Sequence, residues 1–287
     1  MLNIGLIGKT EILEPHVKKF QRNPDINIIG KASIGANDSL NSFHYQIPEI
    51  NRNELIELVD VIIIDNSSKH TFQLLCDIVK KSKHIFIVEY LNLTVEECLQ
   101  LIKLSNESRS VIQVTNLLCF NPAIQWLSQH LINPAYIDIA CISSEIIADN
   151  TLVSLLFVLL GVVGKSPKKI EAVAFSSEQA DSNFNNVRLE YDDASVVTLN
   201  YGKMPQFNKF KIKVYSSGMF VILDFANEIY LNNSIPFTID SVYAVNEPDY
   251  FINTIIKKCK QLNSIEDYLA VLNVVQKINK KISQFSL

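Results

Sequence analysis

Residues 61–101 have the sequence VIIIDNSSKHTFQLLCDIVKKSKHIFIVEYLNLTVEECLQL, and its pattern decides the fold class. The two apolar runs, 61–64 and 84–88, are rich in Val, Ile and Phe, as is typical of strands buried on both faces. After each run, apolar residues recur at helical spacing, over 70–81 and over 94–108. Strands that alternate with helices of this length predict βαβ units and a parallel sheet.

The same alternation continues on the N-terminal side of this stretch and for a short distance beyond it. Thr94 and Glu97 form a capping-box pattern at the start of the last helix. The segments together predict a Rossmann-like, doubly wound parallel sheet, so we assign residues 1–118 to a domain of the dinucleotide-binding type. Further strands are expected at 2–7, 26–32 and 111–115, and further helices at 11–21 and 53–58.

The pattern changes after residue 121, where apolar and polar residues alternate along short segments. This alternation predicts strands with one buried face, and the turn signals Asp192-Asp193 and Ser217-Gly218 lie between them. We therefore assign residues 119–287 to an α+β domain with a mainly antiparallel sheet and terminal helices. Strands are expected at 136–143, 169–175, 186–191, 195–201, 209–215 and 219–224, and helices at 123–131, 152–160, 249–262 and 264–283.

The composition argues against several classes of function. The 287 residues include 26 basic and 30 acidic side chains, and the Lys clusters lie on amphipathic helical patterns, so no nucleic-acid partner is expected. The longest apolar run, 152–163, is shorter than the roughly 20 residues that a bilayer requires, so no membrane partner is expected. The five cysteines lack C-x-x-C spacing and the five histidines lack an i, i+4 pair. We therefore expect free thiols, a cytoplasmic location and no metal site.

The first turn of the predicted sheet lies where a dinucleotide fold has its phosphate loop. Residues 4–13 have the sequence IGLIGKTEIL, in which Gly8 takes the place of the first glycine of G-x-G-x-x-G. Thr10 stands at the second glycine and Leu13 at the third, so a Cβ lies where backbone normally touches the diphosphate. Glu11 adds a negative charge at the same place. We therefore expect NAD or NADP to bind weakly or not at all.

The end of the second strand corresponds to the ribose side of such a site. A carboxylate at Ala32 or Ser33 would receive the ribose hydroxyls, and neither residue is acidic. Ser33 together with Lys31 is suited to a 2′-phosphate, although an ordinary strand-end serine explains the pattern better. Ser33 is accordingly the candidate cofactor contact at this end of the site.

Several motifs resemble the family typified by glucose-fructose oxidoreductase and inositol dehydrogenase, often written Gfo/Idh/MocA. In that family a strand ends in T-P-N-x-x-H, and a later G-K-H-V turn and strand lead into E-K-P. Here His70 and His84 match the two histidines, Glu89 matches the acid, and residues 94–97 match the T-x-x-E start of the next helix. The resemblance continues through FNPA at 120–123 and covers essentially the whole chain. It implies a Rossmann domain, a mainly antiparallel second domain and NAD(P)-dependent oxidoreductase chemistry.

The departures from the family pattern fall on its chemistry. Tyr90 stands at the catalytic Lys of E-K-P, and Asp65 and Ser67 stand in the T-P-N triplet that contacts the cofactor. Ile147 and Thr151 stand at the Asp and the His of a D-x-x-x-H motif that serves in proton transfer. Three functional elements are replaced while the scaffold pattern persists. This indicates an oxidoreductase-type protein with degenerate motifs, weakly catalytic or non-catalytic, that acts as a binding protein or subunit.

One subgroup of the family supports an enzymatic alternative. Biliverdin reductases have Glu-Tyr where other members have Glu-Lys, and Glu89-Tyr90 resembles that pair, as residues 67–70 (SSKH) resemble their serine stretch. Tyr90, with Glu89 beside it, is then the candidate acid of an NAD(P)H-dependent reductase of a small-molecule substrate. The competing interpretation is that the Tyr90 ring fills the space of an absent nicotinamide and that His70 caps a helix. Asp65, at a strand's carboxyl end, is the ionisable group best placed to face a central cleft.

The predicted antiparallel sheet has more apolar positions than one covered face requires. Along 196–201 and 209–215, apolar and aromatic residues occupy positions of both parities. A second covered face is therefore expected, and the family resemblance implies the same, so we predict a homodimer through the outer face of this sheet. The positions that support this prediction are Val196, Tyr201, Phe210, Val214 and Tyr215.

Overall fold

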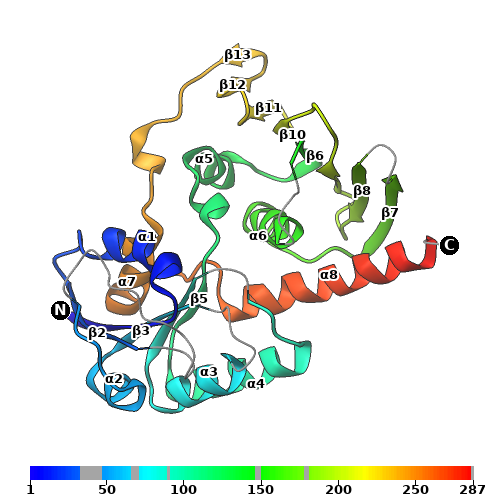
Figure 1. The fold of residues 1–287 in the computed structure, drawn as a ribbon. Coiled ribbons are helices and arrows are strands. Elements are labelled where there is room, and N and C mark those ends of the chain that lie inside the picture. The colour runs from blue at the N-terminus through cyan, green and yellow to red at the C-terminus, as the bar shows by residue number, and fades with distance from the viewer. Residues whose placement is uncertain (33–46, 66–70, 89–90, 146–149, 178–180, 286–287) are drawn as a thin grey trace. The chain divides into compact units, whose positions relative to one another are not determined.

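The computed structural model describes residues 1–32, 47–65, 71–88, 91–145, 150–177 and 181–285, and Figure 1 shows its ribbon. The chain divides into two compact units. Unit 1 contains residues 1–117 and 245–269, and unit 2 contains residues 118–244 and 270–287. Each unit is built around one β-sheet.

The sheet of unit 1 has five strands in the order β2-β1-β3-β4-β5, and all of its neighbouring pairs are parallel. Helices α1 and α7 cover one face, and α2, α3 and α4 cover the other (Figure 1). This arrangement confirms the predicted Rossmann-like sheet. The strands are β1 (Leu2–Ile7), β2 (Ile26–Ala32), β3 (Val61–Asp65), β4 (His84–Val88) and β5 (Ile112–Val114), and the helices are α1 (Thr10–Phe20), α2 (Arg52–Leu58), α3 (Thr71–Lys80), α4 (Val95–Ser108) and α7 (Glu247–Lys257).

The order of the strands reverses at one place in this sheet. From β1 the chain moves to β2 on one side, and it then crosses to β3 on the other side of β1. In open α/β sheets such a switch point leaves a crevice outside the carboxyl ends of the strands, where ligands bind. The turn after β1 and the end of β3 therefore mark the place where a site is expected.

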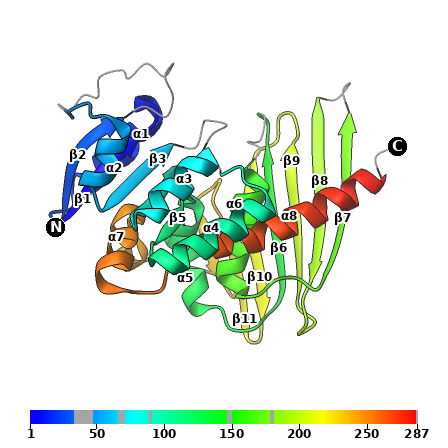
Figure 2. The same cartoon turned by 90° about the horizontal axis from the view of Figure 1, so that it is seen from below.

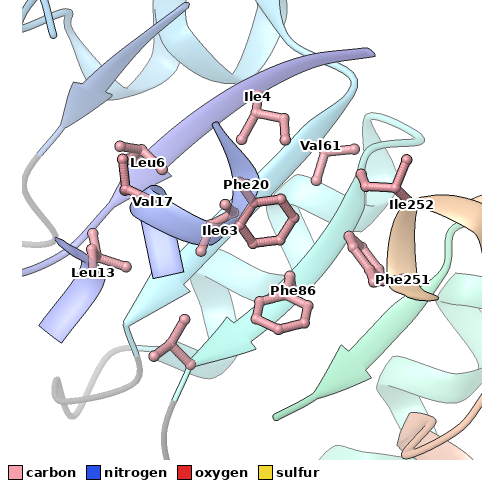
Figure 3. Packing of buried hydrophobic residues seen from close by; sticks show 11 residues of the cluster. Ile4, Leu6, Leu13, Val17, Phe20, Val61, Ile63, Phe86, Phe251 and Ile252 are labelled. Atoms are coloured by element: carbon pink, nitrogen blue, oxygen red, sulfur yellow. The ribbon is translucent and has the colours of Figure 1, made fainter. Parts of the chain in front are cut away.

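The core of unit 1 lies between the sheet, α1 and α7 (Figure 3). Helix α1 buries Leu13, Val17 and Phe20, whose spacing of four and three residues puts them on one helical face. The Phe86 ring contacts the rings of Phe20 and Phe251, with centroids 5.4 Å and 5.2 Å apart. The α7 segment is thus part of the same core as the first helix of the chain.

Local capping signals set the starts of two helices. The Glu97 N–H donates to Thr94 Oγ1 at 3.2 Å, and the Thr94 N–H donates to Glu97 Oε2 at 2.8 Å, which confirms the predicted capping box of α4. Helix α8 (Ile265–Phe285) begins in the same way, with reciprocal hydrogen bonds between Ser264 and Asp267.

The sheet of unit 2 has eight strands in the order β13-β12-β11-β10-β6-β9-β8-β7. Only the β6–β9 pair of this sheet is parallel, so the prediction of a mainly antiparallel sheet is confirmed. The last two strands, β12 and β13, were not expected from the pattern because they are short. The strands are β6 (Pro134–Ser143), β7 (Lys169–Ser177), β8 (Ser182–Glu190), β9 (Val196–Lys203), β10 (Lys209–Ser216), β11 (Met219–Asp224), β12 (Ile229–Asn232) and β13 (Ile235–Pro236).

Helix α6 (Thr151–Val163) and the later turns of α8 cover one face of this second sheet (Figure 2). Leu156 of α6, Leu189 of β8 and Val274 of α8 line a common cavity of about 20 Å³, which has room for roughly one water molecule. The remaining helical segments of unit 2 are η1 (Leu117–Phe120), which begins at the boundary, α5 (Pro122–His130) and η2 (Ser241–Tyr243). No helix in the described part of the chain is long and apolar enough to cross a membrane.

Residues 245–269 belong to a different unit from the one predicted. The sequence pattern assigned them, with the rest of 119–287, to the second domain. These residues pack in unit 1, where Phe251 and Ile252 join the core and Ser264 forms a β-bridge with Gln113. Amphipathic helices at the end of a chain have an apolar face, but the sequence does not show which sheet that face covers. The chain therefore crosses between the units more often than its order of segments indicates.

Candidate functional site

The carboxyl edge of the parallel sheet brings together the ends of the strands that precede the predicted site residues. Gly8 directly follows β1, Asp65 is the last residue of β3, and Ala32, which precedes Ser33, ends β2. The Gly8 N–H donates to the Ala32 carbonyl oxygen at 3.1 Å, so the turn after β1 is held against the end of β2. The predicted residues Gly8 and Asp65 thus lie next to each other at the switch point.

Gly8 is required by the close approach of β3. Its φ of +136° lies in a region that L side chains rarely adopt, and a Cβ added to it would lie 2.3 Å from the Asp65 Cβ. In a phosphate loop the first glycine allows a tight turn, and Gly8 serves that purpose here. The space beside the turn is taken by the side chain of Asp65.

The Asp65 carboxylate is directed at the start of α1. Its side chain is fully buried, and its Oδ2 accepts a hydrogen bond from the Lys9 N–H at 3.2 Å. Lys9 is the residue before α1, and the N-terminus of a helix carries a partial positive charge that favours anions. A carboxylate of the protein therefore uses a backbone donor of the turn that would face a bound phosphate in a dinucleotide fold.

The second and third glycine positions of the turn carry buried side chains. Thr10 is the first residue of α1 and is 5% exposed, and Leu13 belongs to the core of unit 1. Glu11 lies in the first turn of the same helix and is exposed. Side-chain atoms therefore occupy positions where a diphosphate needs open backbone, and two carboxylates lie near the helix start. The described residues of this turn fit a dinucleotide diphosphate poorly.

The end of β2 is paired on its outer side. The Lys31 N–H donates to the Pro48 carbonyl at 2.9 Å, and the Lys31 carbonyl accepts from the Ile50 N–H at 2.9 Å. The Lys31 residue is itself buried. The 47–50 segment therefore extends the sheet next to the expected ribose side of the site.

Five of the predicted site residues lie outside the described residues. These are the cofactor-binding candidates that follow β2 and β3 in the sequence and the catalytic pair that follows β4. Their predicted roles stay predictions. The residues are Ser33, Ser67, His70, Glu89 and Tyr90.

A second buried carboxylate at this edge was missed by the sequence interpretation. Glu247, the first residue of α7, is 2% exposed and accepts hydrogen bonds from Thr115 Oγ1 at 2.7 Å and from the Asn116 N–H at 3.0 Å. Burial raises the pKa of Glu247, and these two hydrogen bonds act in the opposite direction. Its position before Pro248 indicates a helix start, but no local signal links it to residues 115–116.

His16 of α1 is a half-buried titratable group of unit 1. Burial, and secondarily the charge of Lys19, lower its pKa to about 4, so the ring is neutral at neutral pH. Its ring centroid lies 6.0 Å from that of Phe86. Its Nδ1 is buried, and no group within the described ranges hydrogen-bonds to it. The ring packs beside Phe86 of the core.

Among the residues that the structure describes, no group of three His, Cys, Asp or Glu side chains is placed to hold a metal ion. The described cysteines are free thiols, of which Cys259 is exposed, and burial raises the pKa of the Cys98 thiol to about 12. These groups add nothing to the candidate site, which consists of the turn after β1 and the end of β3.

Solved structures similar to this chain include dehydrogenases and a reductase. UDP-N-acetylglucosamine 3-dehydrogenase GnnA from Acidithiobacillus ferrooxidans is similar over 99% of this chain and 98% of its own, with a TM-score of 0.82 and 16% sequence identity. A protein from Sinorhizobium meliloti provisionally assigned as a myo-inositol dehydrogenase has a TM-score of 0.76 at 15% identity, over 99% of this chain and 98% of its own. Biliverdin reductase from Synechocystis, solved with biliverdin and NADP+, has a TM-score of 0.72 at 12% identity, over 98% of this chain and 99% of its own.

These likenesses extend over both units and confirm the fold that the resemblance to Gfo/Idh/MocA oxidoreductases implied. No protein-family model and no curated protein sequence matches the chain significantly.

Proposed function

We propose that this protein has an oxidoreductase fold of the Gfo/Idh/MocA type with a degenerate cofactor site, and that it acts as a binding protein or subunit rather than as an efficient reductase. The observation that carries the proposal is the buried Thr10 side chain at the second glycine position, at the start of α1. A phosphate loop supplies open backbone N–H donors at this point, and a Thr side chain obstructs the approach to them.

The size of the expected effect follows from the contacts that this turn lacks. A charge-assisted hydrogen bond contributes about 1.5–3 kcal/mol, and Glu11 opposes a diphosphate electrostatically. The loss of two such contacts weakens a micromolar site by a factor of roughly 10² or more. NADH and NADPH are therefore expected to bind with dissociation constants above roughly 100 μM.

Isothermal titration calorimetry of the wild-type protein with NADH and with NADPH tests this proposal. Dissociation constants in the low micromolar range would contradict it. The matched variant Thr10→Gly/Glu11→Asn should bind both dinucleotides more tightly than the wild type, because it opens the turn and removes the opposing charge.

The second candidate is an NAD(P)H-dependent reductase in which Tyr90 donates a proton to a conjugated small-molecule substrate. The likeness to biliverdin reductase from Synechocystis favours it, together with the Glu89-Tyr90 pair. Under this alternative, Tyr90→Phe lowers turnover by about 10² or more, as loss of a general acid does. Robust oxidation of NADPH by the wild type with a bilin or a small carbonyl substrate would favour this alternative over the degenerate site.

We also propose that two copies associate through the outer face of the unit 2 sheet. The register places Val196, Tyr136, Tyr215 and Phe220 on one face, and the rings of Tyr215 and Phe220 stack with centroids 4.5 Å apart. The register places Tyr201, Phe210 and Val214 on the opposite face, which covers the core, so these three predicted residues do not support the proposed interface. Light scattering should give twice the 32.5 kDa chain mass, and a monomer at micromolar concentration would contradict the proposal.

A further inference from the structure

The switch point of the unit 1 sheet contains a negative charge that belongs to the protein. Asp65 ends β3, next to the turn that follows β1, and its side chain is fully buried. Its Oδ2 accepts the Lys9 N–H at 3.2 Å, immediately before α1 begins. The Asp65 Cβ lies so close to Gly8 that a Cβ on that glycine would be only 2.3 Å away. The Lys9 N–H, the start of α1 and the buried Asp65 carboxylate are therefore packed together.

We propose that the Asp65 carboxylate is a built-in anion that takes the place of a ligand phosphate at this turn and so excludes diphosphate ligands. The inference rests on the proposed function, because it names the residue that keeps the degenerate turn closed to dinucleotides. It concerns a group other than Thr10 and Glu11, which act through steric obstruction and through a charge at the exposed side of the turn.

Electrostatics explains how this residue would exclude an anionic ligand. Two negative charges a few ångströms apart repel each other, and the repulsion is several times stronger near a protein surface than in bulk water because the effective dielectric constant is lower. Asp65 is shielded from water, so solvent does not screen its charge as it would at an exposed position. A phosphate that approached the Lys9 N–H would meet this charge and would also compete for the same donor.

Asp60, which directly precedes β3, is a matched control. Its Oδ2 accepts the Asn3 N–H at 2.9 Å, so it makes the same kind of bond to backbone of β1. The Asp60 side chain is exposed and lies at the amino edge of the sheet, away from the start of α1. Removal of its charge should leave anion binding at the switch point unchanged.

The experiment compares Asp65→Asn, Asp65→Ser and Asp60→Asn, each in the Thr10→Gly/Glu11→Asn background. Asn keeps an oxygen that can accept the Lys9 N–H without the charge, and Ser leaves that donor to a ligand. Calorimetry with inorganic pyrophosphate and with NADH measures affinity, and thermal unfolding by circular dichroism confirms that each variant is folded. A folded Asp65 variant is expected to bind both probes at least tenfold more tightly than the background protein, and Asp60→Asn is expected to show no gain.

The outcomes separate this inference from the proposed function. Folded Asp65→Asn and Asp65→Ser variants that bind no better than the background would overturn the role of Asp65, while weak binding by the wild type would still support the degenerate site. An equal gain in Asp60→Asn would also overturn it, because the effect would then reflect net charge alone. Low-micromolar NADH binding by the wild type would contradict the proposed function itself.

Discussion

The two edges of the parallel sheet carry the same chemical group in different surroundings. At the amino edge, the Asp60 carboxylate accepts the Asn3 N–H at 2.9 Å and remains exposed. At the carboxyl edge, the Asp65 carboxylate accepts the Lys9 N–H at 3.2 Å and is fully buried. Water can replace the first interaction, but it cannot reach the second. Substitutions at the carboxyl edge are therefore expected to change the free energy of unfolding far more than substitutions at the amino edge.

Glu247 extends this contrast along the carboxyl edge. It is almost wholly buried and takes two hydrogen bonds from residues 115–116, just after β5. Buried carboxylates that accept backbone N–H groups thus occur twice on the side where a fold of this type binds ligands. Substitutions at this edge should be costly, and equivalent substitutions at the amino edge should be mild.

The largest effect is expected from Gly8→Ala. A Cβ at this position would lie 2.3 Å from the Asp65 Cβ, at a φ of +136°. Backbone strain and overpacking each cost about 1–3 kcal/mol, so a loss of about 2–6 kcal/mol in the free energy of unfolding is expected. Urea denaturation measures it. Asp65→Gly in the same background should recover the part due to the clash.

Gly161→Ala is the matched control for this prediction. Gly161 lies inside α6, and a Cβ there would meet nothing within 4 Å. Because Ala favours a helix over Gly by about 1 kcal/mol, this variant should be as stable as the wild type or more stable. If Gly8→Ala lowers the free energy of unfolding by less than about 1 kcal/mol, the turn can relax. The close packing of the carboxyl edge would then not constrain the turn.

The next effect in size is expected at Glu247. Glu247→Ala leaves Thr115 Oγ1 and the Asn116 N–H without their acceptor and opens a cavity, so a loss of about 2–4 kcal/mol is expected. Glu247→Gln keeps the shape and one acceptor oxygen and should cost less than half as much. Urea denaturation of the two variants at pH 7 provides the measurement.

The pH dependence of Glu247→Gln gives a second readout. The pKa of Glu247 is raised above its ordinary value of 4.5 in the folded protein, mainly by burial. Its contribution to stability is therefore fully present below pH 4.5 and is lost as the pH rises through the raised pKa. The Gln variant should gain stability relative to the wild type as the pH rises. A gain on acidification instead would contradict the raised pKa.

The same physical distinction explains what could be predicted from the sequence. The capping box of Thr94 and Glu97 and the strands at 26–32 and 84–88 depend on neighbouring residues, and the structure has them as predicted. The placement of Gly8 and Asp65 at the carboxyl ends of their strands followed from the rule that ligand sites lie there, but their direct contact was not predicted. The hydrogen bond from Lys9 did not follow, because it depends on a side-chain rotamer across 56 residues of chain.

The packing of α7 in unit 1 was even harder to predict from the sequence. Glu247 and residues 115–116 are separated by more than 130 residues, and an acidic residue before a proline indicates only a helix start. The division at residue 118 was based on a change in pattern along the chain, and such a change does not report which sheet a later helix covers. Long-range pairing of this kind requires the structure.

His16 offers a smaller test of burial beside the same sheet. Burial lowers its pKa from 6.5 to about 4, so its contribution to stability is present above pH 6.5 and is lost as the pH falls through about 4. As the pH falls from 6.5 to about 4, the free energy of unfolding should fall less in His16→Gln than in the wild type. The difference should be roughly 1–3 kcal/mol, with allowance for the partial exposure of the ring. Urea denaturation at pH 8, 6 and 4 measures the difference. Parallel pH curves for the two proteins would contradict it.

The smallest effect is expected from Asp60→Asn, at the amino edge. The Asn Oδ1 can still accept the Asn3 N–H, the Asp60 N–H still donates to the Asn3 carbonyl, and the lost charge is exposed to solvent. The free energy of unfolding should change by less than about 0.5 kcal/mol, as for most surface substitutions. Urea denaturation at low and at high NaCl concentration checks both the size and the electrostatic part. A loss above about 1.5 kcal/mol would mean that the amino edge also depends on its carboxylate, and burial would then not explain why the two edges differ.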